Sequence, residues 1–166
     1  KYCEDNVNIT EDDCLFYGLM LGKGTYRNNY KVGSIFFETN LHKYYDFFEQ
    51  YLQKHCVHFE KNCNEKYIEF EWKKNIALPL RYNDIYDNKN NKRISHYFLN
   101  LPLNKVKKII VGLLNFSVKN DKQNIQNVIY YNRYSKIMEN LRYLLLRIGI
   151  PCNVYFENCY LTMEIP

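Results

Sequence analysis

Seven side chains that can bind a polyanion lie on or beside the predicted strands of this chain. Lysine and arginine bind phosphate through charge and hydrogen bonds, and side chains on the exposed face of a sheet can reach base edges. The seven are Arg27, Tyr30, Lys31, Lys73, Lys74, Lys119 and Lys122. Solvated turn residues would give the same pattern, and a net charge of +5 is compatible with an anionic partner without requiring one.

A second group of residues has only a weak resemblance to a metal site. His55, Cys56, His58 and Cys63 lie within nine positions, but they contain no CxxC pair and no second pair at zinc-finger spacing. We therefore expect no metal there, with Cys56 a small buried residue and both histidines on the surface at a helix end. Six cysteines in 166 residues are also too few for a disulfide scaffold, so free thiols are expected.

Length and composition indicate one folded domain, or two very small halves that share a core. The chain has 166 residues, of which 46% are hydrophobic and 17% aromatic, and this is enough apolar surface to exclude disorder. No apolar run approaches the roughly 18 residues that span a bilayer, and the first residues lack the pattern of a signal peptide. We expect an intracellular monomer with no membrane contact.

The sequence repeats once, at a spacing of about 94 residues. Gly112 follows Gly18 at that distance, and Tyr130-Tyr131 follows Phe36-Phe37 at the same distance. The segments FEKNC and YIEFEW of the first half return as FENC and YLTMEI in the second. Four matches in one order indicate two related halves.

Periodicity predicts the order α-β-β-α-β-β in each half. The predicted helices are 11–22, 41–55, 103–116 and 134–148, and the predicted strands are 25–27, 32–38, 57–59, 67–72, a pair ending at 125–131, 153–156 and 160–165. Thr10 and Asp13 have capping-box spacing, Asn28-Asn29 is the predicted turn, and Gly149 is a helix stop.

The two leading helices each place a glycine among large apolar residues. This costs about 1 kcal/mol against alanine unless close packing compensates for it. We therefore expect the helix backbones to touch at Gly18 and Gly112 and to join the halves about a pseudo-twofold axis. The predicted halves are 10–72 and 95–166, and the linker 73–94 is expected to be polar, rich in turns and unable to build core.

These motifs resemble the LAGLIDADG homing endonucleases, particularly the endonuclease domains inside inteins. LFYGLMLGKGTY is similar to the family's GLxLGDG segment, and IVGLLNFSVKND, preceded by Leu101-Pro102, is similar to its second signature. LRYLLLRIGI is similar to the last long helix of the family. The resemblance implies an α+β fold of two pseudo-symmetric halves, packed through the signature helices, whose antiparallel sheets form a saddle on double-stranded DNA.

The family's metal-binding acids are missing at the matching positions. The resemblance implies one carboxylate from each signature helix, and together these hold the Mg²⁺ ions that activate water for phosphodiester cleavage. Lys23 stands at the first position and Ser117 at the second, with Asn115 in place of the preceding acid. An ammonium group cannot coordinate Mg²⁺, so we expect no catalytic residues, no metal and no cofactor, with Mg²⁺ only if the chain is active.

Two residues are possible remnants of the chemistry. Asp121, four positions after Ser117, is the only plausible substitute carboxylate, because Asp12 and Asp13 lie at the opposite end of their predicted helix. Lys92 in KRIS matches a family block whose lysine is implied to help at the scissile phosphate. A surface lysine in a linker is the plainer interpretation of Lys92.

Three functional hypotheses follow. The favoured one is a catalytically degenerate domain that still binds duplex DNA through the seven side chains and is part of an intein or larger host protein. The second is an active endonuclease with an altered metal site. The third is a structural or protein-interaction insert without DNA binding, which Glu69 and Glu71 in YIEFEW favour because they make one sheet face acidic.

Overall fold

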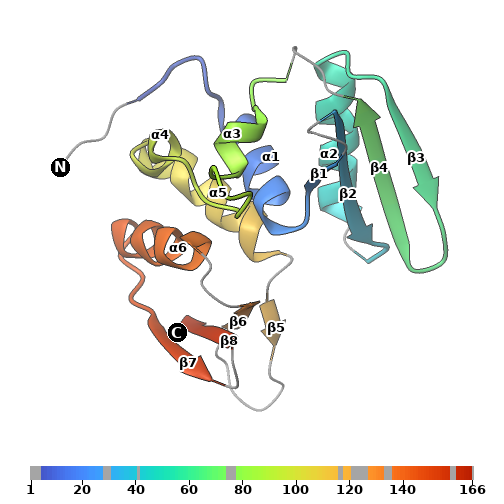
Figure 1. Cartoon of the computed structure of the whole chain (residues 1–166). Helices are drawn as coiled ribbons and strands as arrows, with labels where there is room; N and C mark the ends of the chain where they lie inside the picture. Colours follow the sequence, from blue (N-terminus) through green and yellow to red (C-terminus); the bar gives the residue numbers. More distant parts are fainter. Residues whose placement is uncertain are drawn as a thin grey trace. The chain divides into compact units, whose positions relative to one another are not determined.

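The α-β-β-α-β-β order occurs twice along the chain (Figure 1). The computed structural model describes residues 5–27, 31–40, 42–73, 78–115, 118–120, 127–132, 136–157 and 160–165. The first set is α1 (Glu11–Gly22), β1 (Thr25–Arg27), β2 (Val32–Glu38), α2 (His42–Lys54), β3 (Phe59–Cys63) and β4 (Tyr67–Lys73). The second is α5 (Leu103–Leu114), β5 (Val118–Asn120), β6 (Asn127–Asn132), α6 (Lys136–Arg147), β7 (Asn153–Glu157) and β8 (Tyr160–Ile165).

Each set forms one antiparallel four-stranded sheet. The strand orders are β1-β2-β4-β3 and β5-β6-β8-β7, so the second sheet repeats the order of the first. This confirms the predicted α+β class. The predicted Asn28-Asn29 turn lies outside the described residues.

The strand predicted at 57–59 is wrong in position. Its place is taken by β3, which begins at Phe59 and pairs with β4 from Phe59↔Trp72 to Cys63↔Ile68. The register follows from the turn, where the Asn64 side chain accepts hydrogen bonds from the backbone N–H groups of Lys66 (2.8 Å) and Tyr67 (2.9 Å). Val57 is buried ahead of the strand, which is why its apolar side chain suggested an earlier start.

The chain divides into two compact units. One contains residues 23–82, and the other contains residues 1–22 together with 83–166. The helix α1 therefore belongs to the same unit as α5, against which it packs. Among the described residues, no helix is long and apolar enough to cross a membrane.

The pairing of α1 with α5 depends on two glycines. A Cβ atom added at Gly18 would lie 2.3 Å from the carbonyl oxygen of Ile109 and 3.0 Å from Cα of Gly112. One added at Gly112 would lie 2.7 Å from the Leu15 carbonyl oxygen. No real Cβ approaches backbone atoms this closely, so the two backbones are in direct contact at the expected glycines.

Helix ends in this unit follow the local sequence. Thr10 Oγ1 accepts a hydrogen bond from the N–H of Asp13 (3.1 Å), and Asp13 Oδ2 accepts one from the N–H of Thr10 (2.8 Å). This confirms the predicted capping box, with aspartate in the place usual for glutamate. At the end of α6, Gly149 has a φ of 82° and the N–H of Ile150 donates to the Leu145 carbonyl, which confirms the helix stop.

The prediction that residues 73–94 build no core is wrong. Ile85 is fully buried at the end of the short helix α3 (Tyr82–Ile85), and Ile94 is buried just before α4 (His96–Leu99). The buried Tyr17 hydroxyl connects both places to α1, because it donates to the Asp84 carbonyl and accepts from the Ser95 N–H (3.1 Å). Four buried apolar residues, Leu78, Leu80, Ile85 and Ile94, thus lie within the polar stretch that composition alone identified as a linker.

In the unit of residues 23–82, α2 covers one face of the sheet. Its Phe48 ring lies 5.4 Å from Phe37, 5.6 Å from Phe70 and 5.6 Å from Trp72, measured between ring centroids. These side chains come from β2 and β4 and alternate with residues that point to the opposite side. The opposite face is free of α2 and carries the charged strand residues other than Lys61, which bonds Glu49 of α2.

Candidate nucleic-acid interface

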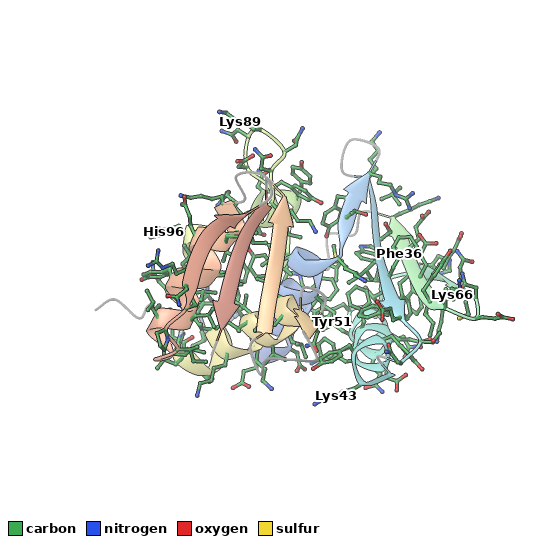
Figure 2. All side chains as sticks on the ribbon, turned by 90° about the horizontal axis from the view of Figure 1, so that it is seen from below. Phe36, Lys43, Tyr51, Lys66, Lys89 and His96 are labelled. Carbon is green, nitrogen blue, oxygen red and sulfur yellow. The ribbon has the colours of Figure 1, made fainter. Side chains whose placement is uncertain are left out.

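The sheet face opposite α2 is the candidate interface and is called the outer face below. Side chains alternate along a strand, so the pairing register assigns each residue to one face. The residues of the outer face are Thr25, Arg27, Val32, Ser34, Phe36, Glu38, Glu60, Asn62, Tyr67, Glu69, Glu71 and Lys73. Figure 2 labels Phe36 on this sheet and Lys66 at the β3–β4 turn.

Two of the predicted cations, Arg27 and Lys73, lie at one end of the outer face, and a third, Lys31, comes next to this end in the chain. Arg27, Val32 and Lys73 are consecutive cross-strand partners on β1, β2 and β4, and Lys31 comes directly before Val32. Arg27, Lys31 and Lys73 are all exposed. This end of the sheet can therefore present the charges of Lys31 and Lys73 to a phosphate backbone.

The middle of the outer face is acidic. Arg27 Nη2 lies 2.6 Å from Glu71 Oε2 and 3.8 Å from Glu69 Oε1, so the guanidinium reaches across β2 to two carboxylates on β4. The four glutamates of this face outnumber its two cations, Arg27 and Lys73. A phosphate group would be repelled from this region unless a cation lay between it and the carboxylates.

The other predicted contacts cannot be placed on a surface. Lys119 lies in β5, where its backbone pairs with Val128, but its side chain is outside the described residues. Tyr30, Lys74 and Lys122 lie outside them altogether, as do the possible metal positions Ser117 and Asp121. The roles expected for these six residues remain predictions.

Lys23 is the residue that the resemblance places at the first metal position of the family. Its ammonium group can bind an anion but cannot bind a metal ion. Its Nζ lies 3.8 Å from Glu38 Oε1, and its side chain is 36% exposed. It lines an open hollow of about 800 Å³ together with Phe36, Lys66 and Tyr67. The ammonium has no lone pair to give a metal, and its charge repels one.

The described residues contain no group of three His, Cys, Asp or Glu side chains that could hold a metal ion. This applies also to the segment around Cys56, which is exposed at a φ of 53° rather than buried as predicted. Cys56 lies in the turn after α2, where its N–H donates to the Gln53 carbonyl (2.9 Å), and this turn holds its side chain at the surface.

Lys92 is not a surface lysine. Its Nζ donates hydrogen bonds to the carbonyl oxygens of Met20 (3.1 Å) and Leu21 (3.0 Å) at the last turn of α1. A cation at this position satisfies carbonyls that lack helical partners and opposes the negative end of the helix dipole. Burial of the ammonium lowers the pKa of Lys92 to about 8.

This pKa gives a test of the buried cap. The native Lys92 releases its proton near pH 8, whereas an unfolded lysine keeps it to about pH 10.4. The unfolded state therefore binds more protons between these values, and the free energy of unfolding that depends on Lys92 should rise with pH across this window. Urea denaturation of the native chain and of Lys92→Met at pH 7, 8, 9 and 10 measures the difference, which should grow in favour of the native chain.

Burial raises the pKa of Cys14 to about 12, so this thiol lowers the free energy of unfolding above pH 9. The effect is the same in the native chain and in Lys92→Met, and the comparison between them cancels it. Lys89→Met is the matched control, since Lys89 is exposed at the tip of the loop between α3 and α4 (Figure 2). Parallel stability curves for the native chain and Lys92→Met would contradict a buried ammonium at the end of α1.

The sequence did not identify the acidic partners of Arg27 as part of its site. Glu69 and Glu71 are 42 and 44 residues away, and the only signal was the YIEFEW alternation that places both on one face. It also missed Lys105, which is buried on α5 and bonds Asp5 (2.6 Å). An isolated lysine on an otherwise regular helix gives no signal for this pairing.

Solved structures with the LAGLIDADG fold match almost the whole chain. A variant of the homing endonuclease I-DmoI matches with a TM-score of 0.68 and 10% identity, over 96% of this chain and 90% of that one. I-DmoI in complex with DNA and Mn matches at 0.67 and 13%, over 96% and 91%. The N-terminal LAGLIDADG domain of DUF199/WhiA matches at 0.62 and 11%, over 96% and 79%.

No family model matches the sequence, and neither does any curated protein. At these identities the likeness establishes the fold, and the chain has the LAGLIDADG homing-endonuclease fold.

Proposed function

We propose that this chain is a LAGLIDADG domain that binds double-stranded DNA and has lost the metal site of an endonuclease. The observation that carries the proposal is the fold, since it matches I-DmoI in complex with DNA and Mn over 96% of this chain. The candidate contacts are the exposed cations at one end of the outer face, Arg27, Lys31 and Lys73. The replacement of the first metal-binding acid by Lys23 supports the loss of cleavage.

The context of the domain is part of the same proposal. The resemblance of its two signature segments to intein endonuclease domains favours a position inside a larger host protein. The splicing residues of such a host would then lie outside this sequence. We propose that the chain acts as a monomer, because the α-β-β-α-β-β order occurs twice within it.

Salt dependence of DNA binding is the first test. The full chain is titrated into a pool of random duplexes between 50 and 200 mM salt. Each phosphate contact contributes about −0.9 to the slope of log affinity against log salt, so the two contacts of Lys31 and Lys73 alone predict about a 12-fold loss of affinity over this range. Lys31→Ala and Lys73→Ala should each reduce the slope by about 1.

Lys43→Ala is the matched control. Lys43 is equally exposed but lies on α2, which covers the other face of the sheet (Figure 2). Its removal should leave the slope unchanged. Absence of binding at 50 mM salt would overturn the proposal.

A second candidate function is supported by the acidic region of the outer face. Four glutamates on one sheet suit a protein partner better than a polyanion. Under this alternative the domain is a structural or protein-interaction insert, and the native chain should show no salt-sensitive DNA binding.

A further inference from the structure

Glu71 and Glu69 hold the guanidinium of Arg27 in place, and they occupy only part of its hydrogen-bonding capacity. Its Nη2 bonds Glu71 Oε2 at 2.6 Å, and Glu69 Oε1 lies 3.8 Å away on the same side. Among the described residues, none accepts a hydrogen bond from Nε or Nη1. The side chain is 52% exposed, so these donors remain accessible from the outer face.

The local charge selects against phosphate at this position. Two carboxylates lie beside one guanidinium, and the resulting net charge is negative. A phosphate oxygen that approached Arg27 would also approach Glu69 and Glu71 and would be repelled by both. A neutral group that accepts hydrogen bonds meets no such repulsion.

The edge of a G·C base pair has the complementary chemistry. Guanine presents two acceptors in the major groove, O6 and N7, at the spacing of the arginine fork. Cytosine presents the N4 amino donor beside them, and a glutamate can accept from it. Arg27 and Glu71 supply donors and an acceptor side by side, with Nη2 and Oε2 2.6 Å apart.

We infer that Arg27, oriented by Glu71 and Glu69, reads one G·C base pair in the major groove. The inference rests on the proposed DNA binding and adds the base pair and the residues that recognise it. Lys31 and Lys73 lie beside this site and contact the phosphate backbone. The glutamates of the outer face then orient the arginine that recognises the base pair.

The test is selection from the random duplex pool by the native chain, Arg27→Lys, Arg27→Ala and Glu71→Gln. The native chain should enrich sites with an invariant G·C pair at one position. Arg27→Lys keeps the charge but loses the planar fork, so discrimination at that position should fall by roughly 5- to 150-fold. The slope against salt should be unchanged, because no phosphate contact is lost.

Glu71→Gln removes one carboxylate and releases the guanidinium toward phosphate. Discrimination at the same position should fall, and the salt slope should become steeper by about 1. Lys73→Ala is the matched control on this face, and it should weaken binding to all sequences equally. Exposed ion pairs contribute little to stability, so these variants should fold as the native chain does, which thermal unfolding checks.

Each contrary outcome is distinct. If Arg27→Lys leaves the base preference unchanged, Arg27 does not read a base. If Arg27→Ala lowers affinity uniformly and reduces the salt slope by about 1, Arg27 contacts phosphate. Salt-sensitive binding without enrichment overturns this inference alone, whereas no binding by the native chain overturns the proposed function as well.

Discussion

Gly18→Ala should lower the free energy of unfolding by about 3 kcal/mol, although alanine is the better helix former by about 1 kcal/mol. The new Cβ would lie 2.3 Å from the Ile109 carbonyl oxygen and 3.0 Å from the Gly112 Cα, both of which are backbone atoms. Neither can rotate away, so α1 and α5 must separate along their whole contact. Gly112→Ala meets the Leu15 carbonyl at 2.7 Å and should cost a similar amount.

The loss would be a large fraction of the stability of a domain, which is typically about 5–15 kcal/mol in total. Urea denaturation followed by circular dichroism measures it. Val111→Ala is the matched control, because Val111 neighbours Gly112 on the same helix but is 44% exposed, and it should change stability by less than about 1 kcal/mol. Equal losses for Gly112→Ala and Val111→Ala would contradict backbone contact between the helices.

The contact between α1 and α5 could largely be predicted, because the sequence contains the same glycine pattern twice. Gly18 and Gly112 occupy equivalent places in two apolar helices, and both the glycine and its apolar neighbours are local features. The start of α1 followed from the Thr10–Asp13 cap and the end of α6 from Gly149 in the same way. Local hydrogen bonds and periodicity decide these elements, so no knowledge of distant contacts is needed.

Residues that depend on distant partners could not be predicted in this way. Lys92 meets the carbonyls of α1 across 71 and 72 residues, and its sequence neighbours are those of an exposed loop. Tyr17 bonds the backbone at Asp84 and Ser95 across similar separations. These groups are buried because a distant segment of the chain packs over them. The polar composition around Ile85 gave no sign that this segment packs there.

The candidate site lies between these cases. Alternation in YIEFEW placed Glu69 and Glu71 on one face, but Arg27 comes from a different hairpin. Their contact depends on β4 pairing with β2 and not with β1, an order that sheet topology decides. Charge on the face was therefore predictable from one strand, whereas the ion pair that orients Arg27 was not.

Magnesium should not convert bound duplex into nicked duplex. The residue predicted at the first metal position is Lys23, whose ammonium cannot coordinate a metal and repels a divalent cation. The Glu38 carboxylate lies 3.8 Å away and already interacts with this charge. Incubation of the enriched site with the chain in millimolar Mg²⁺, followed by denaturing electrophoresis, should show intact strands.

A measurement that does not depend on cleavage separates weak metal binding from none. An ion that binds only the native state at 100 times its Kd raises the free energy of unfolding by about 2.7 kcal/mol. Unfolding in Mg²⁺ should instead match unfolding in a monovalent salt of the same ionic strength. If Mg²⁺ stabilised the chain, or EDTA-sensitive nicks appeared and were abolished by Asp121→Ala, a metal site would have survived with Asp121 as its carboxylate. Glu38→Gln is the control, because it removes a carboxylate that Lys23 already neutralises and should leave both measurements unchanged.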